Sequence, residues 1–255
     1  MNVFVKKNNR WLLLLGFLIF VIWSLYDTNF SLRDLAFGLP NIWYFISQMF
    51  PPDIESFPKL LKPALVTIEM AVLGTSFAII LSIPLGFIAA RNMSKNKVTY
   101  ILSRGIIAFT RSVPDIVFAL IFISAVGLGP FPGTLALAVH SIGMLGKLYA
   151  EAVEEIDPLP LEAITSVGAN SIQRIVYGVF PQVLPSFIAT TLYRLDINIR
   201  SSVVLGLVGA GGIGFELLTS MRLFKYQEIL SILVVIFIMV MGIEWISSRI
   251  RSKII

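Results

Sequence analysis

Charged side chains within long apolar stretches are the residues of this 255-residue sequence that could do chemistry. A charge inside a bilayer costs free energy unless it faces a cavity or a partner. Arg111 lies thirteen residues into its stretch and is followed by Ser112 and Pro114. The proline frees backbone groups, and a guanidinium at this depth can bind an oxyanion. Arg111 and Ser112 are therefore candidates for an anion path, with a buried ion pair as the equal alternative for Arg111.

Three polar residues, Asp196, Asn198 and Arg200, alternate at the end of a later apolar stretch. On a helix they would point to different faces, whereas in an extended turn they would share one. Two interpretations stay open: a structural network at the outer end of this stretch, or a gate that admits an anion. Asn198 and Arg200 accordingly join the candidate substrate path.

The other charges have simpler explanations. Arg104 and Lys147 are expected to extend toward the cytoplasmic interface, where long basic side chains reach water. Glu69 is expected to pair with a nearby cation. His140, the only histidine, has no accompanying set of metal ligands, so we expect a hydrogen-bonded core residue.

Several classes of chemistry are excluded. With no cysteine and one histidine, the sequence offers no thiolate metal site and no convincing catalytic set, so we expect no metal, no cofactor and no enzyme active site. Residues 209–214 fit the dinucleotide pattern G-x-G-x-x-G, but apolar flanks argue against a soluble βαβ unit. Close helix packing is favoured there, with a flexible element near a substrate path as the alternative. No ATP-binding P-loop is present, so ATP hydrolysis would need another chain.

Composition predicts an all-α, polytopic membrane protein. Hydrophobic residues make up 56% of the chain and charged residues 14%, and the mean hydropathy is +0.86. The net charge of +5 does not indicate nucleic acid, because the basic residues flank apolar stretches that imply a lipid bilayer. At roughly 20 residues per crossing, six stretches qualify: residues 11–26, 63–90, 98–128, 131–149, 175–195 and 229–246.

Lysine and arginine set the predicted orientation. With six crossings, the basic groups at residues 6–10, 91–97 and 249–253 fall on one side, which the positive-inside rule makes the cytoplasm. Both termini are then cytoplasmic. A seventh crossing at residues 201–218 would place the basic C-terminus outside, so this segment is expected to be re-entrant or to form short helices shielded by protein. We divide the chain into an N-terminal helix with an external segment, residues 1–62, and a transmembrane core, residues 63–255.

A loop at residues 152–174, cytoplasmic in this topology, carries the most specific local pattern. A short amphipathic helix here would pack on the membrane face or dock in a groove of a soluble partner. Its signals are Asp157 as cap, Pro158 in the first turn, Glu162 toward the positive end of the dipole, Gly168 as stop, and Asn170 with Gln173 as the next capping box.

The spacing of this loop resembles the EAA loop of permease subunits in binding-protein-dependent ABC importers, which runs Glu-Ala-Ala, three residues, Gly, nine residues, Ile, one residue, Leu-Pro. Other segments, at residues 111–114, 143–151, 177–185, 196–200 and 205–214, resemble the phosphonate-type branch of that family. The similarity covers most of the chain from residue 63 onward. Glu162, Ala163, Gly168 and Pro181 match the EAA loop, whereas the remaining positions are Ile164, Gly178 and Phe180.

This resemblance implies a fold and a set of partners. The fold is the type I importer permease fold, a bundle of about six transmembrane helices in the inner (plasma) membrane with a cytoplasmic coupling helix. The partners are two copies of an ABC ATPase subunit, a second permease copy in a homodimer, and an external phosphonate-binding protein. The substrate is phosphonate or a related phosphorus oxyanion, with methionine, phosphate or sulfonate importers as alternatives. A passive channel would have no use for the coupling loop.

Overall fold

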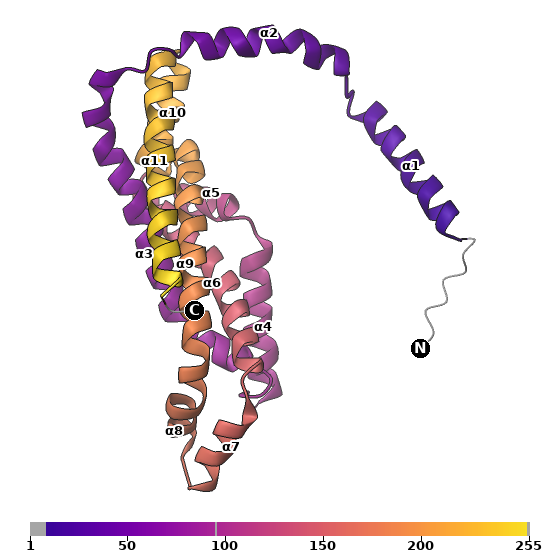
Figure 1. Ribbon diagram of the computed structural model, residues 1–255, viewed down its shortest axis with the longest axis vertical. Coiled ribbons are helices and arrows are strands. Elements are labelled where there is room, and N and C mark those ends of the chain that lie inside the picture. The colour runs from indigo at the N-terminus through magenta and orange to yellow at the C-terminus, as the bar shows by residue number, and fades with distance from the viewer. Residues whose placement is uncertain (1–8, 95, 254–255) are drawn as a thin grey trace. The chain divides into compact units, whose positions relative to one another are not determined.

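The computed structural model describes residues 9–94 and 96–253, and the regular elements among them are helical (Figure 1). Internal contacts divide the chain into two compact units, Met1–Gln48 and Met49–Ile255. The first contains α1 (Asn9–Asp27) and α2 (Leu32–Gln48). α1 is apolar along its length, and α2 is more strongly amphipathic. From Trp11 onward the two helices have the length and composition of one broken span, bent by 53°.

The second unit contains the helices that position the candidate site. It begins with a short 3-10 turn (Ile54–Ser56) and contains two π-helical segments, Arg174–Val179 and Gly206–Ala210. Its α-helices are α3 (Phe57–Ala89), α4 (Lys97–Ser112), α5 (Asp115–Val126), α6 (Pro130–Glu154), α7 (Pro158–Ser166), α8 (Ser171–Gln173), α9 (Phe180–Leu205), α10 (Gly212–Arg222) and α11 (Tyr226–Arg251).

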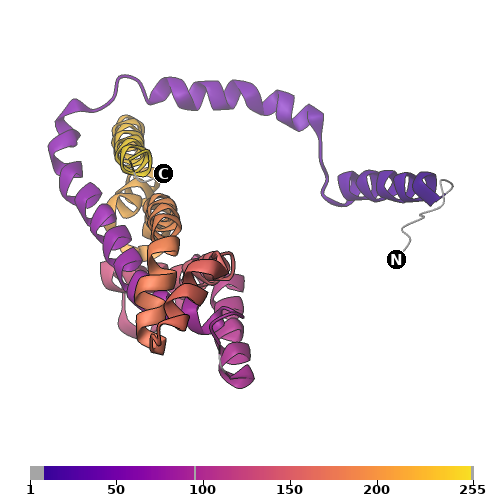
Figure 2. The same ribbon diagram turned by 60° about the horizontal axis from the view of Figure 1, so that its bottom comes forward.

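Helices α3, α6 and α9 pack against one another and form the centre of this unit. Small residues permit the close approach: a Cβ added to Gly74 of α3 would lie 2.8 Å from the Cβ of Leu137 in α6, and one added to Gly86 would lie 2.8 Å from the Cβ of Tyr149. Such contacts drive helix association in lipid, where apolar side chains gain little by leaving the solvent. In Figure 2 the yellow helix α11 is foreshortened and lies beside the orange helix α9.

Fewer helices qualify as spans on composition than the six predicted. Among the described residues, Ile54–Ala89, Ser171–Ala210 and Tyr226–Arg251 are long and apolar enough, and counting each bent pair as one span gives up to five. α6 holds the fourth predicted stretch and has 25 residues, enough to cross a bilayer. It is packed among α3, α4, α5 and α9. Because protein rather than lipid covers α6, it can carry polar and small residues that lower its hydropathy.

The stretch predicted at residues 98–128 is two helices, since α4 and α5 meet at a bend of 89°. Val113 and Pro114 form the break. A proline disfavours helical geometry in the residue before it, which explains the position of the bend. Arg111 therefore lies in the last turn of α4 and beside a break rather than in the middle of a straight span.

α9 extends beyond the predicted end of the fifth stretch at residue 195 and runs to Leu205. The extended-turn alternative for the polar residues is wrong, because Asp196, Asn198 and Arg200 are all helical. They face different sides, as expected for a helix: Asn198 is buried, whereas Arg200 is exposed. Asp196 and Arg200 are one turn apart and pair with each other, which keeps both charges compatible with a continuing helix.

Residues 201–218 form no seventh crossing, because α10 has only 11 residues, about half the length needed. The turn before it requires glycine: Gly209 and Gly211 have φ angles of 103° and 79°. A Cβ on Gly214 would overlap the carbonyl oxygen of Val203. The glycine run therefore serves a tight turn and close packing, the interpretation that its apolar flanks favour.

Candidate functional site

α7 is the short helix predicted between two spans, and it lies with α8 at one end of the second unit (Figure 1). Its ends have the expected local structure. The side chain of Asp157 accepts a hydrogen bond from the Leu159 amide at 3.0 Å, and Pro158 occupies the first turn. Gly168 adopts a φ of 86° just beyond the helix, a conformation that other residues rarely take. The start and stop predicted for this helix are confirmed.

The segment after α7 also follows its local signals. Asn170 and Gln173 form the predicted capping box, in which each side chain accepts a hydrogen bond from the other residue's amide at 2.9 Å. A π-helical segment then leads into α9, and Pro181 lies in the first turn of that helix. Proline cannot donate the α-helical hydrogen bond, and the wider π turn directly before it accommodates that loss.

One face of α7 packs on the π-helical segment. Leu161 and Ile164 are half-buried, and a Cβ added to Gly178 would approach their Cδ1 atoms to 2.9 and 3.4 Å. Glycine stands here where the EAA pattern has isoleucine, and its small size lets α7 lie against this segment. The replacement of isoleucine by Gly178 therefore makes room for the contact between α7 and the π-helical segment.

The opposite face of α7 is exposed and holds the matched residues Glu162 and Ala163. Because α7 begins at Pro158, Glu162 lies in its second turn; the predicted benefit from the helix dipole is wrong, since that effect fades beyond the first turn. Exposed apolar side chains flank Glu162, including Leu159 at 68% and Val167 at 83% exposure. An acidic group among exposed apolar side chains on a helix suits a groove in another protein.

Gln182 joins α7 to α9. The Asp157 amide donates to Oε1 of Gln182 at 3.0 Å, and Nε2 of Gln182 donates to the Gly178 carbonyl at 2.7 Å. Three residues, Glu155, Ile156 and Asp157, connect the end of α6 to the start of α7. A displacement of α7 is therefore transmitted to both α6 and α9.

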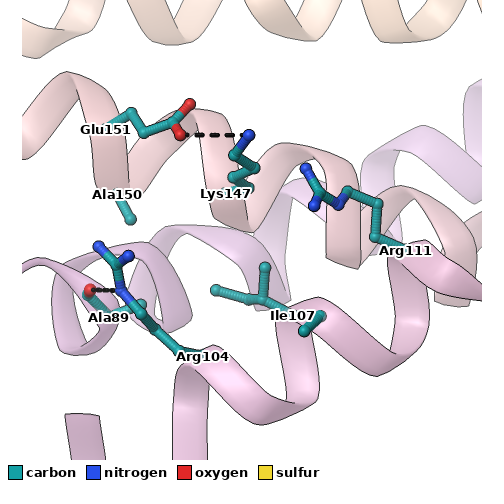
Figure 3. Close-up of a pocket in the computed structure, with 8 residues that line it drawn as sticks. Ala89, Arg104, Ile107, Arg111, Lys147, Ala150 and Glu151 are labelled. Atoms are coloured by element: carbon teal, nitrogen blue, oxygen red, sulfur yellow. Dashed lines mark hydrogen bonds and ion pairs between the residues drawn. The ribbon is translucent and has the colours of Figure 1, made fainter. Parts of the chain in front are cut away.

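A cavity of ≈ 250 Å³ lies between α4 and α6, and its lining is rich in cations (Figure 3). Nζ of Lys147 lies 3.3 Å from Glu151, one turn along α6. Arg111 is exposed and makes no ion pair with a described residue, so the buried ion pair proposed for it is wrong. Its guanidinium points toward Lys147 (Figure 3). The lining consists of Ala89, Arg104, Ile107, Ala108, Arg111, Lys147, Ala150 and Glu151.

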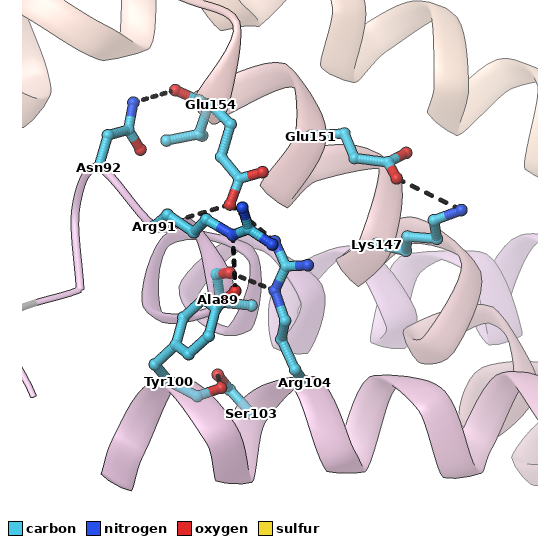
Figure 4. Close-up of polar contacts among 10 residues, drawn as sticks. Ala89, Arg91, Asn92, Tyr100, Ser103, Arg104, Lys147, Glu151 and Glu154 are labelled. Carbon is cyan, nitrogen blue, oxygen red and sulfur yellow. Dashed lines mark hydrogen bonds and ion pairs between the residues drawn. The ribbon is translucent and has the colours of Figure 1, made fainter. Parts of the chain in front are cut away.

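Arg104 was expected to extend into water at the cytoplasmic interface, but its side chain instead belongs to a hydrogen-bonded network with neighbouring helices (Figure 4). Its Nη2 lies 2.7 Å from Oε1 of Glu154, and its Nε donates to the Ala89 carbonyl at 3.0 Å. The same Glu154 oxygen accepts the Arg91 amide at 2.7 Å. A hydrogen bond to the Tyr100 hydroxyl raises the pKa of the Arg91 guanidinium. One carboxylate at the end of α6 thus ties together the end of α3 and the first half of α4.

The ion pair between Arg104 and Glu154, which joins two helices, is expected to stabilise the fold more than the pair between Lys147 and Glu151 within α6. In a double-mutant cycle with Arg104→Gln and Glu154→Gln, we expect a coupling free energy of about 0.5–1 kcal/mol, because both side chains are only partly exposed. The matched cycle on Lys147 and Glu151 should give about 0.3–0.5 kcal/mol. Thermal unfolding of the purified protein measures both, and equal coupling in the two cycles would contradict the structural role of Glu154.

Asn198 lies in a buried polar cluster at the crossing of α3, α6 and α9. Its Nδ2 donates to the hydroxyls of Thr75 at 2.8 Å and Ser141 at 2.9 Å. The same Ser141 hydroxyl accepts Nε of Arg194 at 2.8 Å. Sequence reasoning missed Arg194, although its i, i+4 spacing from Asn198 places both on one helix face once α9 is known to continue past residue 195.

Arg200 points away from this cluster. It lies 3.0 Å from Asp196 and 3.3 Å from Glu244 of α11, so that one cation joins two carboxylates across two helices. The structural network expected here is present, but in the interior of α9 rather than at the outer end of a span.

The remaining predicted residues are dispersed. Ser112 is exposed and donates to the Ala108 carbonyl at 2.7 Å. Glu69 is exposed on α3 and makes no ion pair with a described residue, so its predicted cation partner is wrong. Nδ1 of the half-buried His140 lies 3.0 Å from the Val113 carbonyl. The structure therefore does not bring Arg111, Ser112, Asn198 and Arg200 into one site.

A packed bundle of membrane-length helices, with a capped helix exposed between α6 and α9, is the architecture of a polytopic membrane protein. Residues 82–251 match the family described as binding-protein-dependent transport system inner membrane component, and the chain belongs to that family.

Individual comparisons agree with this membership. The chain is 43% identical over 238 residues to the putative phosphite transport system permease HtxC of Stutzerimonas stutzeri, covering 93% of this chain and 84% of that protein. It is 44% identical over 228 residues to the phosphate-import permease PhnE of Mycolicibacterium smegmatis, covering 89% of this chain and 43% of that protein. Its fold resembles a chain of the inward-facing MetNI methionine ABC transporter, with a TM-score of 0.69 at 20% identity over 80% of this chain and 99% of that one.

Proposed function

We propose that this chain is the permease subunit of an ABC importer that moves phosphonate, phosphite or phosphate into the cell, driven by ATP hydrolysis in a partner subunit docked on α7. Membership in the family of binding-protein-dependent components supports the import function. The exposed, capped α7 with Glu162 on its outer face carries the docking assignment. The relatives named for phosphite and phosphate support the substrate class.

The partners in this proposal follow from the importer mechanism. Two permease copies form a homodimer with the substrate path at their axis, and each offers one α7 to one of two ATPase subunits. Closure of the ATPase pair moves α7, and the covalent link to α6 and the Gln182 hydrogen bonds pass the motion to the spans. Both termini and α7 lie on the cytoplasmic side in this proposal, which the positions of the basic residues beside the apolar stretches support. An external binding protein delivers the anion.

Within this scheme, Arg111 is the residue of the predicted path with the best support. It lines the cavity between α4 and α6 and has no carboxylate partner among the described residues. A guanidinium at the surface of a cavity attracts an oxyanion and can donate two parallel hydrogen bonds to it. Ser112, at the end of the same helix, remains part of the proposed path, and so do Asn198 and Arg200 of α9.

Replacing Arg111 by alanine is expected to lower ATP-dependent uptake about tenfold, the effect of losing one charge-assisted contact. Docking of the ATPase should not change, because Arg111 lies on α4 and away from α7. Uptake into vesicles and co-purification of the ATPase measure the two effects. Lys97→Ala is the matched control, since it removes one exposed charge from the start of the same helix. Unchanged uptake in Arg111→Ala would remove this residue from the path.

Uptake by the whole complex tests the proposed function. Vesicles holding this chain with its ATPase and binding protein are given labelled methylphosphonate, phosphite, phosphate or methionine, with and without ATP. We expect ATP-dependent uptake of at least one phosphorus oxyanion. Uptake of methionine alone would support an importer but contradict the proposed substrate class. Uptake without ATP would indicate a channel.

A further inference from the structure

Arg194 is the most deeply buried charged residue of the described chain that lacks an ionic partner. Its exposed fraction is 3%, and it forms no ion pair with a described residue. Nε donates to the Ser141 hydroxyl at 2.8 Å, whereas Nη2 is buried and has no hydrogen-bond partner. Asp115 attracts the Arg194 charge at longer range and compensates it in part, but the two side chains form no ion pair.

Such a group is costly to a membrane protein. A guanidinium keeps its charge in proteins, and an uncompensated charge in a low-dielectric interior costs several kcal/mol in general. A neutral side chain of similar length would remove that cost, so fold stability gives no reason for an arginine here. Buried charges without a partner mark places where a charged ligand completes the site.

The neighbours of Arg194 bind its Nε and leave the buried Nη2 without a hydrogen-bond partner. The Ser141 hydroxyl accepts Nε of Arg194 and Nδ2 of Asn198, and it donates to Oδ1 of Asn198 at 3.2 Å. Asn198 also donates to Thr75, whose hydroxyl donates in turn to the Ala71 carbonyl at 2.7 Å. The hydrogen bonds among these neutral groups are therefore satisfied within the cluster, and the free Nη2 of Arg194 is the donor that lacks an acceptor.

We propose that Arg194 is an anion-binding residue of the permease itself, and that its Nη2 edge binds an oxygen of the transported phosphorus oxyanion in an occluded step of transport. The inference rests on the proposed function and names a residue for it. The guanidinium fork fits oxyanions that carry two or more acceptor oxygens, the geometry of phosphonate, phosphite and phosphate. Ser141 and Asn198 act as positioning residues, because they fix the orientation of the guanidinium.

The location suits an occluded step. The cluster joins three helices, α3, α6 and α9, and two of them are linked to α7. Relative motion of α9 and α6 would open the buried cluster to an anion, and the return motion would enclose it. Ser141 and Lys147 are six residues apart on α6, about 9 Å along its axis at 1.5 Å per residue. The Arg194 cluster and the cavity that Arg111 lines therefore both include residues of α6.

Stability and anion binding together distinguish a ligand site from a structural residue. The experiment uses the purified wild-type complex without the binding protein. Phosphite, methylphosphonate and inorganic phosphate are each expected to raise the midpoint temperature of its thermal unfolding more than chloride does at the same ionic strength. Arg194→Gln should lose this response and unfold at the same or a higher temperature without anion, because an unpaired buried charge is gone. Its ATP-dependent uptake should fall about tenfold or more, as expected for loss of a charged contact. Arg222→Gln, an exposed arginine at the end of α10, is the matched control.

Each outcome either supports or contradicts anion binding by Arg194. If Arg194→Gln keeps both uptake and the anion response, Arg194 does not bind the substrate. If it fails to fold, Arg194→Lys and Ser141→Ala replace it: an unchanged anion response in both overturns the proposal, and a weakened response in both supports it. If the wild type takes up no phosphorus oxyanion, the proposed function is wrong. If the wild type takes up a phosphorus oxyanion and the Arg194→Gln variant takes it up at the same rate, only the role of Arg194 is wrong.

Discussion

Reversing the charge at Glu162 is expected to lower ATP-dependent uptake at least about tenfold while the amount of folded, membrane-inserted protein stays unchanged. Glu162 is exposed and takes part in no hydrogen bond or ion pair with the described residues, so the fold does not depend on it. Surface substitutions of this kind usually change the free energy of unfolding by less than about 0.5 kcal/mol. A docking groove shaped for a carboxylate would instead meet a lysine, at a cost of several kcal/mol to association.

The experiment separates docking from folding. Glu162→Lys is compared with Glu155→Lys, which makes the same charge reversal at an exposed position of the same loop but outside α7. Uptake, ATPase activity with and without loaded binding protein, and co-purification of the ATPase are measured for both. In Glu162→Lys, ATPase activity should no longer respond to loaded binding protein. Normal uptake in this variant would rule out α7 as the coupling helix.

Gly214→Ala is expected to destabilise the protein by roughly 2–3 kcal/mol, or to prevent folding, because the added Cβ would overlap the Val203 carbonyl oxygen. This contact joins α9 to α10 through backbone atoms, which cannot move aside as a flexible side chain can. Separation of the two helices would also disturb the hydrogen bond from the Ile213 amide to the Thr67 hydroxyl at 2.9 Å.

Gly242→Ala is the matched control, since a Cβ there meets nothing within 4 Å and the residue lies inside α11. It should leave stability unchanged or increase it by up to about 1 kcal/mol, the difference in helix propensity. Thermal unfolding of the solubilised protein and the yield of folded protein measure both variants. Equal stability of the two would contradict the tight α9 to α10 turn.

Features controlled by neighbouring residues were predictable from the sequence. The start and stop of α7 follow from Asp157, Pro158 and Gly168, because capping depends on side chains and φ angles within a few residues. The capping box before α9 has the same origin. The break near Pro114 belongs to this class too, but the predicted single stretch overlooked it.

Features that depend on contacts between distant residues were predicted poorly. α9 continues through Asp196 and Arg200 because Glu244 of α11 and the one-turn spacing satisfy their charges. Hydropathy alone ended the helix at residue 195. Arg104 pairs with Glu154, fifty residues away, rather than reaching water, and Glu69 has no ion-pair partner on the described chain.

The sequence by itself determined that the protein is a helical membrane protein with a capped loop helix, because hydropathy and capping are properties of contiguous residues. Only the tertiary structure decided which polar residues are left without partners. Arg111 faces a cavity, Arg200 is paired, and Arg194 is buried with a free donor. The physical reason is that the cost of a charge in a membrane is set by the groups around it in space, and these come from helices that lie far apart in the chain.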